Sequence, residues 1–284
     1  MQGNINKIGI IGLGLIGGSL AKDLKSRNVA TSLIGHDRNH AHQARALQLN
    51  IVQEIGNLDT VLKDAGIIIL SVPVNALVKL VPKVLDRIQD QIVIEVGSTK
   101  KKLLDAISDH PKRKNLISMH PMAGTEFTGP DAAIYHLFEK KCCVICDAKD
   151  SDEKKLLIAK NIFERVGMYV IEMESGDHDL HAAYVSHISH VTSFALAQTV
   201  LEKEKNESRI FEMASGGFSS TVRLAKSAPS MWTPIFIQNK ENVLDVLDEH
   251  IHQLMYFKEC LKSGNEEALN TWMARANQIR KIIK

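Results

Sequence analysis

The chain has 284 residues, of which 44% are hydrophobic and 24% are charged, ordinary values for a folded protein of about two domains. Lysine and arginine exceed aspartate and glutamate by only 35 − 33 = 2, which excludes a strongly basic nucleic-acid binder. No apolar stretch approaches the roughly 20 residues that span a bilayer, and the first residues lack the design of a signal peptide. We therefore expect a cytoplasmic protein that binds neither nucleic acid nor membrane.

Short β-rich runs alternate with amphipathic stretches through the first half of the chain. Several runs are unbroken apolar segments, such as IIIL and IVIEV, which are typical of strands buried on both faces of a parallel sheet. The alternation predicts a doubly wound α/β sheet of the Rossmann type. The expected strands are 7–12, 32–35, 66–72, 91–96, 116–119, 142–146 and 168–172, and the expected helices are 19–27, 40–49, 75–88, 100–109 and 152–166.

The alternation stops near Glu174, and the remaining sequence predicts only helices. Pro229 suits the first turn of one of them, and Asn265 suits the start of another. We expect a dinucleotide-binding domain at 1–173 and an all-α substrate and dimerisation domain at 174–284. One expected helix has about 30 residues, longer than a small lone bundle needs, so we also expect a homodimer. The expected helices are 177–205, 219–227, 229–263 and 265–283.

The segment KIGIIGLGLIGGSL places three glycines in G-x-G-x-x-G spacing, after the first expected strand and at the start of a helix. Glycines permit a tight turn and let the backbone approach a pyrophosphate, which the helix N-terminus stabilises. The alternative is a glycine-rich turn with only a structural role. The expected cofactor-binding residues are Gly12, Gly14, Leu15, Ile16, Gly17, Asp37 and Ser71.

Asp37 follows the second expected strand, twenty positions after Gly17. A carboxylate there can accept hydrogen bonds from ribose hydroxyls and repels a 2′-phosphate, which favours NAD over NADP. Arg38 beside it can instead serve a 2′-phosphate, so NADP stays open.

Candidate catalytic residues follow the carboxyl ends of expected strands, where Rossmann-type sheets bind ligands. Ser98 lies in GSTK after the strand IVIEV, and His120 begins HPMAGTE after the strand LISM. Pro121 disfavours a helical conformation of His120 and so places it on an extended or turn backbone. An imidazole there can act as a general base near neutral pH, or it can merely cap a loop.

The helical half carries two histidine pairs and an arginine of interest. His187 and His190 share one helical face, and a straight helix would direct His178 and His181 to nearly the opposite side. We therefore expect no metal site and interpret the histidines as buried or interface side chains. Arg223 follows a glycine-rich loop, where a guanidinium can bind a carboxylate or pair with a surface acid. The apolar run CCVIC predicts reduced thiols in a buried strand.

Together, GLGLIGGSLA, GSTK, HPMAGTEFTG, SHISH and GGFSSTVRLAKSAPSMW resemble the prephenate dehydrogenases and their arogenate-using relatives, in order over nearly the whole chain. The resemblance implies NAD-dependent oxidative decarboxylation of prephenate to 4-hydroxyphenylpyruvate in tyrosine biosynthesis. It implies that His120 takes the proton of the ring hydroxyl and that Ser98 helps to hold His120 and the nicotinamide in register. It also implies that Arg223 binds a substrate carboxylate. The further pocket residues that it implies are Thr125, Glu126, His187, His190 and Trp232.

The resemblance leaves several points open. Relatives commonly carry Asp where this chain has Ser220, so an ionic gate with Glu126 is not assured. Arogenate, or both substrates, could replace prephenate. A β-hydroxyacid or imine-type dehydrogenase would leave HPMAGTE unexplained, and a catalytically silent dinucleotide sensor would be expected to lack His120, Ser98 or Arg223. We expect neither an ACT-type regulatory domain nor a chorismate mutase-like extension.

Overall fold

The computed structural model describes residues 7–205 and 209–282. The chain divides into two compact units, Met1–Asn239 and Lys240–Lys284. These units are separated by compactness. The predicted boundary after residue 173 separates a dinucleotide-binding domain from a substrate and dimerisation domain, and it stays a prediction.

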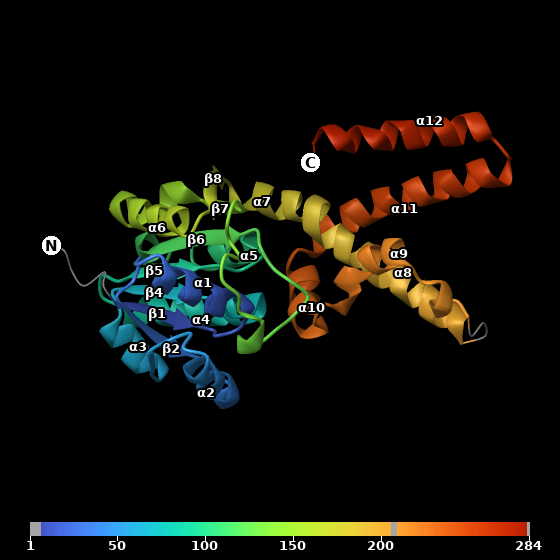
Figure 1. Cartoon of the computed structure of the whole chain (residues 1–284). Helices are drawn as coiled ribbons and strands as arrows, with labels where there is room; N and C mark the ends of the chain where they lie inside the picture. The colour runs from blue at the N-terminus through green and yellow to red at the C-terminus, as the bar shows by residue number, and fades with distance from the viewer. Residues whose placement is uncertain (1–6, 206–208, 283–284) are drawn as a thin grey trace. The chain divides into compact units, whose positions relative to one another are not determined.

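The first unit contains an eight-stranded sheet in the order β3-β2-β1-β4-β5-β6-β7-β8 (Figure 1). All neighbouring strands are parallel except β6 and β7, so the last two strands run opposite to the other six. The expected all-parallel sheet is therefore corrected at β7. The connection from β6 to β7 forms no crossover helix, which a parallel return requires. The strands are β1 Lys7–Ile11, β2 Ser32–His36, β3 Glu54–Ile55, β4 Ile67–Leu70, β5 Ile92–Glu95, β6 Leu116–Pro121, β7 Cys142–Cys146 and β8 Tyr169–Met173.

Helices cover both faces of the sheet. On one face Leu24 of α1 and Phe163 of α6 are fully buried in the core formed with the strands, and on the other Val81 and Leu85 of α4 are fully buried likewise. Burial on both faces explains the unbroken apolar runs and confirms the doubly wound fold. The first face carries α1 Leu15–Ser26, α2 His40–Gln48 and α6 Glu153–Arg165, and the second carries α3 Leu58–Asp64, α4 Val74–Arg87 and α5 Lys101–Asp105.

Three short features differ from the expected elements. The two-residue strand β3 and the helix α3 were not predicted. The Asn57 side chain caps α3 by accepting a hydrogen bond from the Thr60 N–H, and this cap was a readable start signal. Helix α1 begins at Leu15, directly after the glycine turn, and not near residue 19.

The helical part of the first unit follows β8. The predicted helix 177–205 is interrupted by a π-helical turn, and the predicted helix 229–263 is wrong as a single helix because it breaks at Asn239. The Asn239 side chain donates to the Asp179 carbonyl at 2.6 Å, which fixes this residue at the helix end. Helix α10 begins at Pro229, as predicted. The elements are α7 Ser175–Ala182, the π turn Ala183–His187, α8 Ile188–Glu204, α9 Gly216–Thr221, the 3₁₀ turn Arg223–Lys226 and α10 Pro229–Gln238.

The second unit contains α11 Lys240–Lys262, α12 Glu266–Ala276 and a 3₁₀ turn at Asn277–Lys281. Asn265 caps α12 by accepting from the Ala268 N–H, which confirms the predicted helix start. The predicted end at residue 283 lies outside the described residues. Among the helices of the described ranges, none is both long and apolar enough to cross a membrane.

Candidate active site

The glycine turn after β1 is packed tightly on one side and open on the other. Gly12 has φ +96°, a conformation that favours glycine. A Cβ on Gly17 would overlap the Gly12 carbonyl oxygen and the Ser71 Oγ, so only glycine fits there. A Cβ on Gly14 would meet nothing nearer than the Gly129 nitrogen at 4.0 Å. The open side at Gly14 suits the close approach of a phosphate group to the backbone.

Two polar side chains fix this turn. The Ser71 hydroxyl donates to the Gly12 carbonyl at 2.6 Å. The Asp37 carboxylate accepts the Leu13 N–H at 2.9 Å and the Asn39 N–H at 2.9 Å, and its side chain is only 13% exposed. These bonds hold a negative charge at the end of β2, beside the turn. Leu15 and Ile16 begin α1 and are half-buried.

His120 lies near the end of β6 on an extended backbone, one of the two conformations that the following proline predicted. Its Nδ1 is 2.8 Å from the Nε2 of His178. Withdrawal from water lowers the pKa of His120 well below its ordinary value, and His178, Lys100 and His187 lower it further. The imidazole is therefore neutral at neutral pH and can accept a proton.

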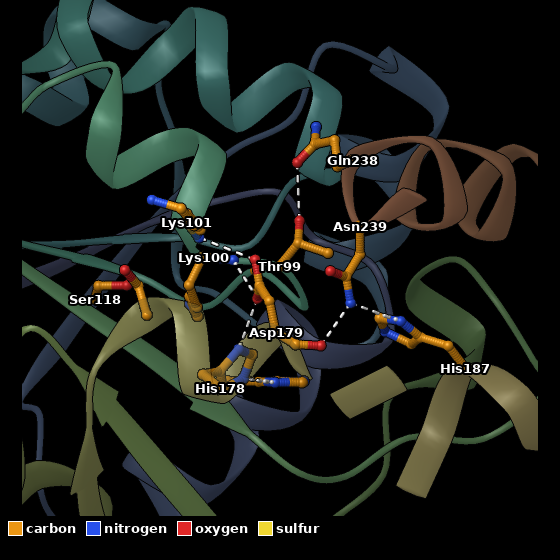
Figure 2. A network of polar contacts seen from close by, with 12 residues as sticks. Thr99, Lys100, Lys101, Ser118, His178, Asp179, His187, Gln238 and Asn239 are labelled. Atoms are coloured by element: carbon orange, nitrogen blue, oxygen red, sulfur yellow. Dashed lines mark hydrogen bonds and ion pairs between the residues drawn. The ribbon is translucent and has the colours of Figure 1, made fainter. Parts of the chain in front are cut away.

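The turn after β5 is tied to two helices of the helical part (Figure 2). The Thr99 hydroxyl donates to Oε1 of Gln238 at 2.8 Å. The backbone N–H groups of Lys100 and Lys101 donate to the Asp179 carboxylate at 2.9 and 3.0 Å. Ser98, the candidate catalytic serine, is half-buried in the same turn.

A buried ion pair joins the ends of β5 and β6. The Lys100 ammonium lies 2.6 Å from Glu95 and donates to the Met119 carbonyl at 2.5 Å, with both charged side chains fully buried. Glu95 also accepts bonds from the Ser118 hydroxyl and the Gly97 N–H. These contacts tie the ammonium to the ends of both strands. The sequence analysis missed this pair, although a glutamate within the apolar run IVIEV was a visible signal.

The π turn at Ala183–His187 changes which histidines meet. A π turn takes up one residue more than an α turn, so it rotates the following residues relative to α7. His178 and His187 are both buried and share one polar network, whereas His181 is exposed. The expectation that these pairs point to opposite sides is therefore wrong, because it assumed a straight α-helix.

Asn239 closes this network (Figure 2). Its Nδ2 donates to the Asp179 carbonyl and lies 3.1 Å from the Nδ1 of His187. Burial lowers the pKa of His187 to about 4, so this ring is also neutral at neutral pH.

His187, His190 and Trp232, three predicted pocket residues, meet in one aromatic cluster. The His190 ring stacks on Trp232 with the ring centroids 3.4 Å apart, and His187 meets it edge-on at 5.9 Å. Within the described part of the chain, the buried Nε1 of Trp232 has no hydrogen-bond partner. This cluster therefore offers a donor in an apolar setting.

Arg223 forms an ion pair with Glu126, whose carboxylate is 3.1 Å from the guanidinium. The pKa of Glu126 is lowered from its ordinary value. The largest cause is the hydrogen bond that its carboxylate accepts from its own backbone N–H, and the positive charges of Arg223 and Lys226 lower the pKa further. The Ser220 hydroxyl donates to the Gly217 carbonyl at 2.9 Å. A cavity lined in part by Glu126 and Lys226 lies beside it.

Thr125, the remaining predicted pocket residue, is next to Glu126 in the chain. The Thr125 hydroxyl accepts a long bond of 3.3 Å from the Phe127 N–H. In residues 7–205 and 209–282, no group of three or more His, Cys, Asp or Glu side chains is arranged to hold a metal ion.

Comparison with known families gives two adjoining matches. Residues 20–172 match the family model described as prephenate dehydrogenase, nucleotide-binding domain. Residues 174–275 match the model described as prephenate dehydrogenase, dimerization domain.

Individual proteins agree. The chain is 30% identical over 275 residues to the prephenate dehydrogenase of Bacillus subtilis, covering 95% of this chain and 74% of that protein. The structure of Aquifex aeolicus prephenate dehydrogenase in complex with hydroxyphenyl propionate and NAD⁺ is 30% identical, with a TM-score of 0.90 and all of both chains covered. The Synechocystis arogenate dehydrogenase structure is 27% identical, with a TM-score of 0.76 over 98% of this chain and 100% of that chain. A nucleotide-binding sheet, a neutral strand-end histidine and these matches agree that the chain belongs to the prephenate dehydrogenase family.

Proposed function

We propose that this protein catalyses the NAD-dependent oxidative decarboxylation of prephenate to 4-hydroxyphenylpyruvate, CO₂ and NADH, in tyrosine biosynthesis. The observation that carries the proposal is the neutral imidazole of His120 at the carboxyl end of β6. Ligands of doubly wound sheets bind at such strand ends. Family membership supports the reaction class.

The glycine turn supports a dinucleotide cofactor. Gly12, Gly14 and Gly17 would hold the pyrophosphate, with Leu15 and Ile16 at the helix N-terminus and Ser71 supporting the turn from beneath. Asp37 would accept hydrogen bonds from the ribose and disfavour a 2′-phosphate, which supports NAD over NADP. When bound, NAD supplies the hydride acceptor. The Aquifex aeolicus relative was solved with NAD⁺, which agrees with this assignment.

The residues of the chain then have to orient the substrate and manage one proton. His120 accepts the proton of the ring hydroxyl while the carbon that bears it loses hydride, and Ser98 holds the imidazole in register. The ring carboxylate leaves as CO₂, and its bonding electrons make the ring aromatic. The product phenol keeps a proton on the same oxygen, so His120 returns what it took and no net proton is lost there.

Prephenate is a dianion, so its site needs cationic and donor groups. Arg223 would bind one carboxylate in the geometry of a guanidinium fork. Glu126, which pairs with Arg223 in the structure, would have to release it when substrate binds. The surrounding wall would be formed by Thr125, His187, His190 and Trp232.

Arogenate is the second candidate substrate. It differs from prephenate in having an amino group where the side chain of prephenate has a keto group. The likeness to the Synechocystis arogenate dehydrogenase over 98% of this chain keeps this candidate in place. Use of both substrates is the intermediate case.

Steady-state kinetics with prephenate and arogenate, each with NAD and NADP, test the proposal. We expect the highest kcat/KM for prephenate with NAD. Failure to reduce either cofactor with either substrate would overturn the proposed function. Equal kcat/KM with NADP would overturn the role of Asp37 alone.

We also propose a homodimer located in the cytoplasm. The match of residues 174–275 to a dimerization domain supports the oligomeric state. Light scattering of the purified protein at micromolar concentration is expected to give twice the mass of 31.5 kDa. A monomer at these concentrations would contradict this assignment.

A further inference from the structure

Behind His120 lie a second histidine and a carboxylate that the proposed reaction does not use. His120 Nδ1 is 2.8 Å from His178 Nε2, and His178 Nδ1 is 2.8 Å from Asp179 Oδ1. His178 and Asp179 are only 2% and 3% exposed. The three side chains form an unbroken hydrogen-bonded chain that runs from β6 into α7. Figure 2 labels two of its members, His178 and Asp179.

The Asp179 end sets the direction of these hydrogen bonds. The carboxylate already accepts the backbone N–H groups of Lys100 and Lys101, one on each oxygen. A carboxylate in this role has no proton to give, so the proton it shares with His178 is carried by the His178 Nδ1. In an uncharged His178 this is the single ring proton, so Nε2 carries a lone pair. His120 must therefore donate from its Nδ1, which leaves its Nε2 as an acceptor.

We propose that His178 and Asp179 are positioning residues that hold His120 as its Nδ1–H tautomer, with the Nε2 lone pair ready for the substrate hydroxyl. This inference rests on the proposed role of His120. In the transfer, the O–H bond of the substrate breaks and an N–H bond forms at Nε2 of His120. The existing bond from Nδ1 to His178 becomes charge-assisted, and no proton has to move beyond His120.

The surroundings of His120 show why such support is needed. Besides His178, the charged and titratable groups close to it are the Lys100 ammonium, His187 and the Cys143 thiol of the neighbouring strand. Lys100 is positive and the site is withdrawn from water, so both disfavour an imidazolium at this position. The acceptor on His178, backed by the Asp179 carboxylate, offsets this cost when His120 takes the proton.

Three variants test the proposal. His178→Phe keeps a ring but removes the acceptor, His178→Gln keeps an amide oxygen that can accept, and His181→Phe changes an exposed histidine of the same helix. In His178→Phe we expect kcat with prephenate to fall by roughly 10- to 100-fold while the KM for NAD is unchanged. His178→Gln is expected to recover most of this loss, and His181→Phe to match the wild type.

The pH profile separates positioning from a merely structural role. The acid limb of kcat/KM reports the deprotonation of His120. The lowering of the His120 pKa by His178 is charge repulsion and belongs to a protonated His178. In the proposed arrangement His178 is uncharged and accepts a hydrogen bond from the imidazolium, which favours the charged form of His120, so the loss of this acceptor is expected to shift the acid limb of His178→Phe to lower pH. An acid limb that stays in place or moves to higher pH would overturn the proposal.

A spectroscopic measurement gives an answer that does not depend on turnover or on the folding of a variant. In the ¹⁵N-histidine NMR spectrum of the wild-type protein at neutral pH, we expect the proton of His120 on Nδ1. A proton on Nε2 would overturn the proposal. If the wild type reduces no cofactor, the proposed function fails, and the tautomer is still decided. If His120→Asn is inactive while His178→Phe keeps full activity, only the roles of His178 and Asp179 fail.

Discussion

The glycine turn and the histidine network are built by opposite means. The turn requires glycine, which has no side chain, because the backbone and Ser71 fill the space beside Gly17. The network depends on side chains that are present, brought by β6, α7, the π turn and the end of α10. Its members stand up to 119 positions apart in the chain, from His120 to Asn239. Shape therefore governs the glycine turn, and protonation governs the histidine network.

The sharpest way to test this division is a change that removes protonation and keeps size. His120→Asn is expected to lower kcat with prephenate by about 10²- to 10⁴-fold, the usual contribution of a general base. The KM values for prephenate and NAD should change little. Steady-state kinetics beside His181→Asn, which alters an exposed histidine, provide the measurement and its control. Turnover within a few-fold of the wild type would show that another group accepts the proton.

The next prediction concerns the permanent positive charge of Arg223. Arg223→Ala is expected to raise the KM for prephenate by about 10- to 150-fold, since a hydrogen bond to a charged group contributes roughly 1.5–3 kcal/mol. The KM for NAD should stay the same. Arg223→Lys keeps the charge and loses the planar fork, so an intermediate KM is expected. An unchanged KM in both variants would move the carboxylate site elsewhere.

The turn is tested by adding single methyl groups on its two sides. Gly17→Ala is expected to destabilise the fold by roughly 1–3 kcal/mol, because the new Cβ overlaps backbone and Ser71. Gly14→Ala, whose new Cβ comes no nearer than 4.0 Å to the Gly129 nitrogen, is expected to keep the melting temperature and to weaken NAD binding. Calorimetry and NAD titration together distinguish the two sides. Equal loss of stability in both variants would contradict the assignment of Gly14 to the open side.

The smallest effect joins protonation to stability. His187 has a folded pKa of about 4, below the ordinary histidine value of about 6.5. Between these values the unfolded chain binds the proton and the folded chain does not, so stability falls as pH drops from 6.5 toward 4. The slope from this group approaches 1.4 kcal/mol per pH unit. The free energy of unfolding, measured with urea between pH 7 and pH 5, should depend less steeply on pH in His187→Gln than in His181→Gln.

The two regions also differ in how far the sequence predicted them. The turn follows from consecutive residues, and the non-helical conformation of His120 follows from Pro121, so both could be read locally. The central strands, such as β4 and β5, were predicted because burial on both faces leaves unbroken apolar runs, whereas the two-residue strand β3 has no such run. The association of His178 with Asp179 and His120 was not predicted, since it depends on contacts across the fold. The helix break at Asn239 was missed for the same reason: a long-range hydrogen bond fixes it.

The π turn at Ala183–His187 makes this helix of the chain sensitive to the insertion or deletion of single residues. Deleting one residue from it would let α7 and α8 join as one regular α-helix and would strengthen the local backbone bonding. The same deletion would turn every later side chain of that helix by about 100°, carrying His190 away from the Trp232 ring. The extra residue therefore determines which way the later side chains of the helix point, and a more regular helix would lower the activity.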